Sequence, residues 1–176
     1  RYYPEVGKIY ATDFSTEMIK TANENLKMYP NRNIEFLQMD NLNMTFPDKS
    51  FDLISARHTI IDARQIYKAL KDDGVVIIEG VDQKDCWELK ELFGRGQAFK
   101  DKNPISKIDY KNLKEAGFEK IELIEVEENE HYETEEDLLA LLLKTPILDD
   151  FSEEENIEFT HRKEIEKDIF RKYINK

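Results

Sequence analysis

Two short apolar runs, each leading to an acidic residue and separated by one helical stretch, constrain the fold of this chain most strongly. The first run, Ile9–Ala11, leads to Asp13, and the second begins at Ile34 and leads to Asp40. Between them, after Ser15, one face of a helix is formed by Met18, Ile19, Ala22 and Leu26. The order strand, helix, strand predicts a parallel βαβ unit. Both acids then stand at the carboxyl ends of strands, where open α/β sheets bind their ligands.

The remaining pattern predicts further alternation of strands and helices. We expect strands at 51–55, 75–78 and 118–126, with residues 72–74 as a turn. We expect helices that run up to Lys71, from 82 to 93, from a cap at Asp109 to Gly117, from a capping box at Thr134 to Pro146, and from 161 to 174. This alternation indicates an α/β fold.

Size and composition limit the classes of function. The 176 residues, 40% apolar and 36% charged, suit one globular domain, and no apolar run approaches the roughly 20 residues of a membrane span. A single cysteine, Cys86, excludes an internal disulfide and a thiolate cluster, so we expect a reducing, cytoplasmic location and no metal. The net charge of −12 is uneven, because Glu119 to Glu158 holds 16 acidic residues against two lysines, a charge of −14, and the rest of the chain carries +2. This charge makes a nucleic-acid partner unlikely and favours a small molecule, whereas the oligomeric state stays open.

Three segments resemble one known family. They are "GKIYATDFSTEMIKTANENL", "IEFLQMDNLNMTFPDKSFDLISARH" and "IYKALKDDGVVIIEG". Together they look like the class I S-adenosylmethionine-dependent methyltransferases of the type 11-like group. The likeness is close over the first half of the chain and looser beyond it. The resemblance implies S-adenosylmethionine as the cofactor and transfer of its methyl group to a small or medium-sized acceptor.

The resemblance also implies roles for particular residues. Asp13 would hold the ribose of the cofactor, with Phe14 and Met18 beside the adenine, which Asp40, Asn41 and Leu42 would read. Arg57 and His58 would face the methionine end and the incoming acceptor, and His58 is a candidate proton acceptor because imidazole titrates near neutral pH. Independently of the resemblance, the turn Gly94–Gln97 has two glycines around an arginine, a pattern that can bind an anion through backbone and guanidinium, so we expect Arg95 and Gln97 to contact the substrate.

One departure from the family pattern concerns the glycine-rich loop that follows the family's first strand. No segment of the form E/D-x-G-x-G-x-G is present, and the family's last strand is missing as well. We therefore expect a Rossmann-like three-layer sandwich without its first and last strands, in a sequence that lacks an N-terminal piece. We expect one methyltransferase-like domain over 1–176, with a cofactor-binding half at 1–80 and a substrate-side, helical half at 81–176.

Several alternatives stay open on the sequence alone. Asp13 could simply cap the following helix, and Phe14 could be an ordinary core aromatic. His58 could position a ligand without moving a proton, and the turn at Arg95 could be only a loop. For the whole chain, a dinucleotide-dependent oxidoreductase and a degenerate methyltransferase-like module without catalysis compete with the enzyme. The second acid, Asp40, argues against the oxidoreductase, and the missing glycine-rich loop favours the module.

Overall fold

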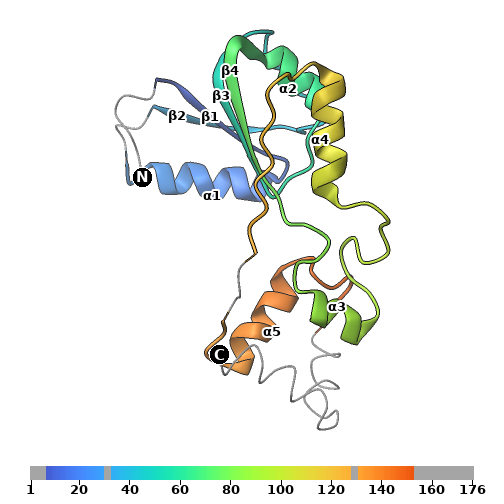
Figure 1. The fold of residues 1–176 in the computed structure, drawn as a ribbon. Helices are drawn as coiled ribbons and strands as arrows, with labels where there is room; N and C mark the ends of the chain where they lie inside the picture. The colour runs from blue at the N-terminus through green and yellow to red at the C-terminus, as the bar shows by residue number, and fades with distance from the viewer. Residues whose placement is uncertain (1–6, 30–32, 128–130, 153–176) are drawn as a thin grey trace. The chain divides into compact units, whose positions relative to one another are not determined.

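The computed structural model describes residues 7–29, 33–127 and 131–152 (Figure 1). In chain order the elements are β1 (Ile9–Asp13), α1 (Thr16–Leu26), β2 (Ile34–Gln38), β3 (Phe51–Arg57), α2 (Ala63–Ala69), β4 (Leu70–Glu79), α3 (Trp87–Phe93), α4 (Ile105–Ala116) and α5 (Glu135–Lys144). The mixed α/β architecture expected from the sequence is confirmed. The helix expected at 161–174 lies outside the described residues.

The chain forms two compact units. The first contains Arg1–Gly80 together with Asn112–Glu119, and the second contains Val81–Lys111 together with Lys120–Lys176. The first unit carries the four strands that the described residues form. The division of function between a cofactor-binding half and a substrate-side half stays a prediction.

The strands of the first unit form two separate parallel pairs. β1 pairs with β2 from Ile9 opposite Ile34 to Asp13 opposite Gln38, and β3 pairs with β4 up to Arg57 opposite Glu79. Within the described residues each sheet has only these two strands. Each strand therefore keeps one hydrogen-bonding edge without a partner strand in this part of the chain.

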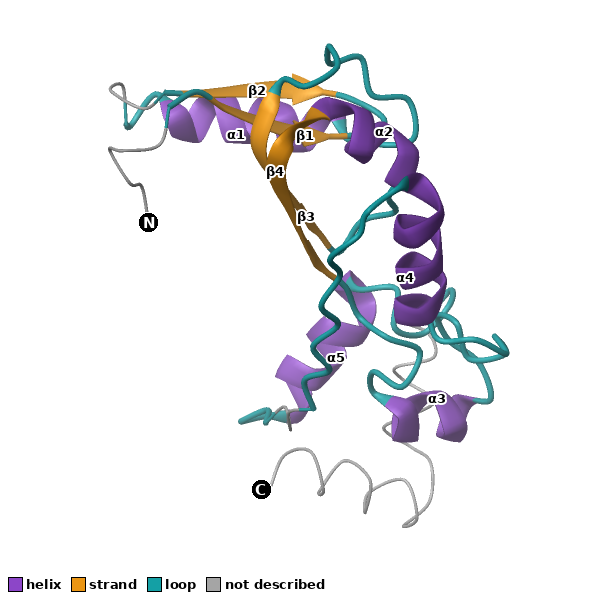
Figure 2. Cartoon of the chain, turned by 45° about the horizontal axis from the view of Figure 1, so that its top comes forward, coloured by secondary structure: helices purple, strands orange, loops and turns teal. Residues whose placement is uncertain are grey.

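Side-chain caps fix the starts of α1 and α2. The Ser15 hydroxyl accepts a hydrogen bond from the N–H of Met18 at the start of α1, which then packs along β1 and β2 (Figure 2). At α2, Asp62 accepts from Arg64 N–H at 2.9 Å and Gln65 N–H at 3.1 Å. These hydrogen bonds from backbone amides, the one from Gln65 first, lower the pKa of the Asp62 carboxyl from its ordinary 3.8.

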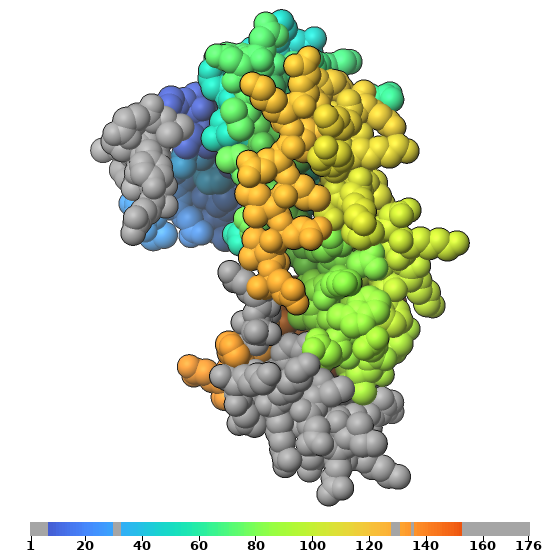
Figure 3. Space-filling model, in the orientation of Figure 1, coloured from blue at the N-terminus to red at the C-terminus, as the bar shows by residue number. Residues whose placement is uncertain are grey.

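Three expectations about local structure are wrong. Residues 72–74 are not a turn between helix and strand, because β4 already begins at Leu70 and its pairing with β3 shifts register between Phe51 and Leu53. Asp109 does not cap α4, which begins four residues earlier, directly after Pro104, at Ile105. Residues 121–127 form no strand, and this extended segment lies at the surface with Ile124 and Val126 exposed (Figure 3).

The second unit has an apolar core centred on α5. As the capping box predicts, Thr134 caps this helix by accepting from Asp137 N–H at 3.1 Å. The core consists of Leu89, Leu138, Leu139, Leu142, Ile147 and Leu148. Lys90 is buried beside it, with 1% exposure, and its ammonium donates to the Gln83 carbonyl at 3.1 Å. Burial lowers the pKa of Lys90 because the charged form loses its hydration.

Candidate functional site

A cavity of about 620 Å³ lies in the first unit, between β1 and β3 and the loops that follow the strands. Its size falls within the range of about 300–1,000 Å³ that is usual for small-molecule sites. It is lined along β1 by Tyr10 to Asp13 and along β3 by Leu53 to Arg57. Successive side chains of a strand point to opposite faces, so a cavity lined by consecutive residues runs along the edge of the strand. The cavity therefore borders the unpaired edges of both strand pairs.

Three aromatic rings at the cavity join the two strand pairs. Tyr10 of β1 lies 5.5 Å from Phe46 and 6.0 Å from Phe51, and the Phe46 and Phe51 rings are 4.8 Å apart, measured between centroids. These distances and the tilted or edge-on angles are favourable for aromatic pairs. Together the rings give the cavity an apolar wall, opposite in character to the polar residues at the strand ends.

Asp13 stands at the carboxyl end of β1 and lines the cavity. Its Oδ1 accepts the N–H of Ser15 at 2.7 Å, whereas Oδ2 has no partner among the residues that the structure describes. Because Ser15, and not Asp13, caps α1, the reading of Asp13 as a bare helix cap is wrong. One carboxylate oxygen shapes the turn and the other can accept a hydrogen bond from a ligand.

Phe14 follows Asp13 in the lining of the cavity. Its side chain is 76% exposed, so it is not the core aromatic that the alternative required. Met18, on the first turns of α1, is 59% exposed but does not line the cavity. Of the two apolar residues predicted beside the adenine, only Phe14 is brought to the site, and the role of Met18 stays a prediction.

The loop after β2 is held by its own side chains. Asp40 accepts the Leu42 N–H at 2.9 Å through Oδ1 and the Asn43 amide at 2.6 Å through Oδ2. Gln65 of α2 secures the loop from outside, accepting from Met44 N–H at 2.6 Å and donating to the carbonyl of Leu42. Asp40 and Leu42 are therefore occupied within the turn and do not line the cavity.

Asn41, between them, does line the cavity. Its amide nitrogen donates to the Thr59 hydroxyl at 2.8 Å, and its Oδ1 lies 3.4 Å from the Thr12 hydroxyl. Asn41 thus connects the end of β1 with the loop that follows β3. Asn41 therefore stabilises the edge of the cavity through Thr12 and Thr59, and its predicted contact with the cofactor stays a prediction.

Arg57 and His58 lie at the carboxyl end of β3, and both line the cavity. A carboxylate from the neighbouring strand, Glu79, accepts from Arg57 Nε at 2.9 Å and lies 3.2 Å from His58 Nε2 through the same Oε1 atom. The Arg57 hydrogen bond, followed by that of His58, lowers the pKa of the Glu79 carboxyl. His58 adopts φ 50, a left-handed conformation that is costly for a residue with a Cβ and is found frequently at functional sites.

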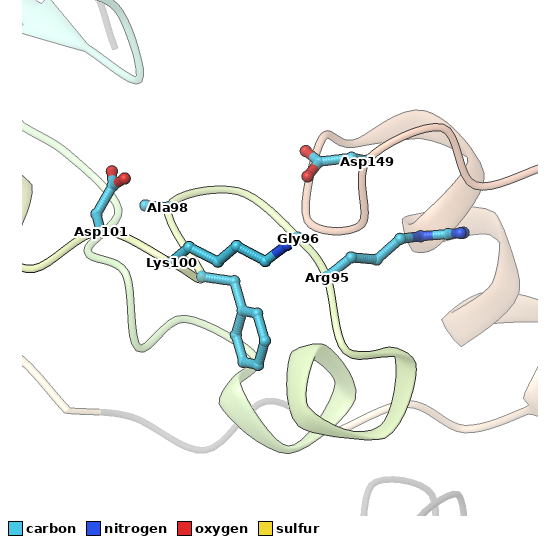
Figure 4. A pocket seen from close by; sticks show the side chains of 7 residues that line it. Arg95, Gly96, Ala98, Lys100, Asp101 and Asp149 are labelled. Atoms are coloured by element: carbon cyan, nitrogen blue, oxygen red, sulfur yellow. The ribbon is translucent and has the colours of Figure 1, made fainter.

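The other two predicted residues, Arg95 and Gln97, belong to the second unit. Gln97 N–H donates to the Ile147 carbonyl at 3.1 Å, and this backbone hydrogen bond holds the turn in place. Gly96 adopts φ +142, a conformation that favours glycine. A cavity of about 200 Å³ beside this turn is lined by Arg95, Lys100 and Asp149 among others, but not by Gln97. The Lys100 side chain is directed back toward Gly96, whereas the Arg95 side chain extends away from it (Figure 4). The substrate-binding roles of Arg95 and Gln97 stay predictions.

Sequence reasoning missed Glu79 and Thr59. Glu79 is the last residue of an apolar strand, as Asp13 is of β1, so the same rule of an acid at a strand end could have identified it. Thr59 carries no such signal. Its part depends on the turn at His58, which the sequence does not reveal.

Comparison with known proteins assigns the N-terminal part of the chain. A family model described as "Methyltransferase domain" matches residues 1–78. The match covers less than half of the 176 residues, and over residues 1–78 the resemblance to class I S-adenosylmethionine-dependent methyltransferases is confirmed.

The chain is similar to particular quinone methyltransferases. It is 29% identical over 117 residues to a demethylmenaquinone methyltransferase of Lactococcus lactis, which covers 62% of this chain and 46% of the relative. It is 31% identical over 67 residues to a 2-phytyl-1,4-naphtoquinone methyltransferase of Nostoc punctiforme, which covers 38% of this chain and 29% of the relative. The chain thus spans less than half the length of these curated relatives.

Among solved structures, an S-adenosylmethionine-dependent methyltransferase from Aquifex aeolicus matches with a TM-score of 0.47 and 20% identity, covering 65% of this chain and 60% of that one. A putative S-adenosylmethionine-dependent methyltransferase from Methanococcus maripaludis matches with a TM-score of 0.47 and 28% identity, covering 66% of this chain and 61% of that one.

None of the helices in the described part of the chain has the length and apolar character that a membrane span requires.

Proposed function

We propose that this chain transfers a methyl group from S-adenosylmethionine to a small or medium-sized acceptor. The observation that carries the proposal is the cavity of about 620 Å³, because it brings together five of the predicted residues from three separate stretches of sequence. These residues are Asp13, Phe14, Asn41, Arg57 and His58. The family match over residues 1–78 supports the same reaction.

The residues present fit the adenosine half of the cofactor. The free Oδ2 of Asp13 is placed to accept a ribose hydroxyl, and the exposed Phe14 ring offers an apolar face for the adenine. Asn41 and the backbone of its loop are the groups that could read the polar edge of the base. Arg57 and His58, on the next strand pair, would stand toward the methionine end.

The sulfonium of the bound cofactor supplies a methyl group that is already activated for displacement. The protein therefore has little covalent chemistry to perform, and alignment of the acceptor can supply most of the acceleration. Arg57 and His58, at the carboxyl end of β3, would orient the attacking atom of the acceptor.

The acceptor is proposed to be a small molecule. Two similar proteins are named for quinone substrates, which are small molecules. The acidic C-terminal third disfavours a polyanionic partner. We place the reaction in the cytoplasm, because the single cysteine provides no disulfide.

Calorimetric titration of S-adenosylmethionine, S-adenosylhomocysteine and NAD into the full chain tests this proposal. We expect the first two to bind with one-to-one stoichiometry and NAD to give only heat of dilution. Circular dichroism of the same sample establishes that the chain is folded. Binding of NAD alone would replace the proposal with the oxidoreductase, and a folded chain that binds none of the three would favour a module without catalysis.

A further inference from the structure

We propose that Glu79 is a positioning residue that holds His58 as the proton acceptor for a methyl acceptor reacting through an acidic hydroxyl group. This inference rests on the proposed methyl transfer and names the substrate class for the same site. Its basis is the arrangement at the carboxyl ends of β3 and β4, where one glutamate binds both the backbone and the side chain of the histidine.

Glu79 contacts His58 at two points. The backbone carbonyl of Glu79 accepts the His58 N–H at 2.9 Å, continuing the β3–β4 ladder one residue beyond Arg57. The carboxylate Oε1 lies 3.2 Å from the imidazole Nε2. The backbone bond fixes the left-handed turn at φ 50, and the carboxylate fixes the direction of the ring. Backbone strain that the neighbouring strand holds in place is typical of functional positions.

The carboxylate also determines which imidazole nitrogen can act as a base. A carboxylate only accepts hydrogen bonds, so Nε2 must carry the proton when the ring is neutral. Nδ1 then keeps its lone pair, and among the described residues it has no hydrogen-bond partner. Because His58 lines the cavity, Nδ1 is the nitrogen available to a bound acceptor.

Arg57 specifies the charge of the acceptor. Its Nε also donates to Glu79 Oε1, at 2.9 Å, and its side chain lines the same cavity. A guanidinium beside the reacting group favours an oxygen that becomes anionic and disfavours an amine, which would become cationic. A hydroxyl on an aromatic ring meets both requirements, because it is acidic enough to give its proton to an imidazole during reaction.

The step balances without a further reactant. The acceptor O–H bond breaks and its proton moves to His58 Nδ1, while an oxygen lone pair forms the new bond to the methyl carbon. The bond from that carbon to the sulfonium sulfur breaks, and its electron pair stays on sulfur as a thioether. His58 then returns the proton to solvent. Glu79 remains ionised throughout and balances the imidazolium charge.

The chain offers a matched control for Glu79. Asp52 and Lys71 form an exposed ion pair at 2.7 Å across the same two strands, at their opposite end. Asp52 does not line the cavity. Asp52→Asn therefore removes a carboxylate from a comparable cross-strand pair without touching His58.

The first measurement is the ¹⁵N NMR spectrum of the imidazole rings in the full chain, with His58 assigned from a His58→Gln variant. We expect the neutral His58 ring to be almost entirely the Nε2–H tautomer in the wild type and in Asp52→Asn, and to become a mixture in Glu79→Ala. An unchanged tautomer in Glu79→Ala would overturn the positioning role. This measurement needs no cofactor, so it decides the role of Glu79 even if S-adenosylhomocysteine fails to bind.

The second measurement is transfer of labelled methyl from S-adenosylmethionine to 1-naphthol and to 1-naphthylamine. We expect transfer to the naphthol only, with kcat lowered at least about tenfold in Glu79→Ala, KM within about twofold of wild type, and Asp52→Asn unchanged. Glu79→Asp, which restores a carboxylate, should recover part of the rate. Equal transfer to the amine, or binding of S-adenosylhomocysteine without transfer to the naphthol, would overturn the inference while the proposed cofactor stands.

Discussion

Replacing Asp13 with asparagine separates the two tasks that its carboxylate performs. Oδ1 accepts the Ser15 N–H at 2.7 Å, and asparagine keeps an oxygen that can make this bond. The second oxygen, which we assign to a ribose hydroxyl, becomes an NH₂ group that donates and cannot accept. The substitution should therefore leave the turn intact and remove one ligand contact.

The size of the effect follows from the charge of the lost acceptor. A hydrogen bond to a charged group contributes about 1.5–3 kcal/mol, which corresponds to a Kd raised about 10- to 150-fold. Titration calorimetry of S-adenosylhomocysteine into wild type and Asp13→Asn measures this ratio directly. Thermal unfolding of the two proteins without ligand should agree closely, because the Ser15 contact survives.

Ser15→Ala is the matched control for this experiment. It removes the hydroxyl that caps α1 through the Met18 N–H, and should lower the free energy of unfolding by about 1 kcal/mol. Its affinity for S-adenosylhomocysteine should be that of the wild type, since the hydroxyl is not assigned to the ligand. If Asp13→Asn binds as tightly as the wild type, Asp13 is not in the cofactor site and our reading of the end of β1 is wrong.

Two further predictions concern stability. Asp62→Ala removes the carboxylate that accepts from the N–H groups of Arg64 and Gln65, and should lower the free energy of unfolding by about 0.5–2 kcal/mol in urea at pH 7. Folding lowers the pKa of Asp62, so this contribution is present above about pH 4 and is lost as the pH falls. The free energies of unfolding of the two proteins should therefore converge in acid. A difference that does not shrink as the pH falls below about 4 would contradict this. Gly96→Ala places a Cβ 2.5 Å from the Ile147 carbonyl oxygen and 2.7 Å from Lys90 Cγ, and should lower the unfolding midpoint by the equivalent of about 1–3 kcal/mol. Gly80→Ala, whose Cβ meets nothing within 4 Å, should have little effect, and equal losses in both variants would refute the packing argument.

The βαβ unit could be predicted from sequence because its signals are local. Alternating apolar residues, the Ser15 cap and the acids at strand ends each act within a few residues, and β1, α1 and β2 formed as expected. The prediction of a strand at 118–126 was wrong. The apolar residues there fit the local pattern of a strand, but a strand also needs a neighbouring strand to pair with, which the local pattern does not show. The start of β4 at Leu70 was missed for a related reason: Asp72, Asp73 and Gly74 suggest a turn, and pairing with β3 overrides them.

The same distinction applies to the site. Asp13 and Asn41 could be predicted because they follow strands, and strand ends share one edge of a sheet. Asp40 was predicted by the same rule, yet its oxygens are used by Leu42 and Asn43. Whether a carboxylate faces a ligand or its own turn depends on loop geometry, which no spacing rule contains. Glu79 obeys the same strand-end rule, but its contact with His58, 21 residues away in sequence, could not be predicted from local spacing.

The unpaired strand edges beside the cavity divide it into two parts of different chemistry. Alternate residues of β1 and β3 present main-chain N–H and C=O groups on that side, since each strand uses its other side for its neighbour. Groups of this kind pair with another strand, so the space between the two edges has the chemistry of a strand position. The part of the cavity that suits a small molecule is therefore the part at the carboxyl ends, where Asp13, Arg57 and His58 lie.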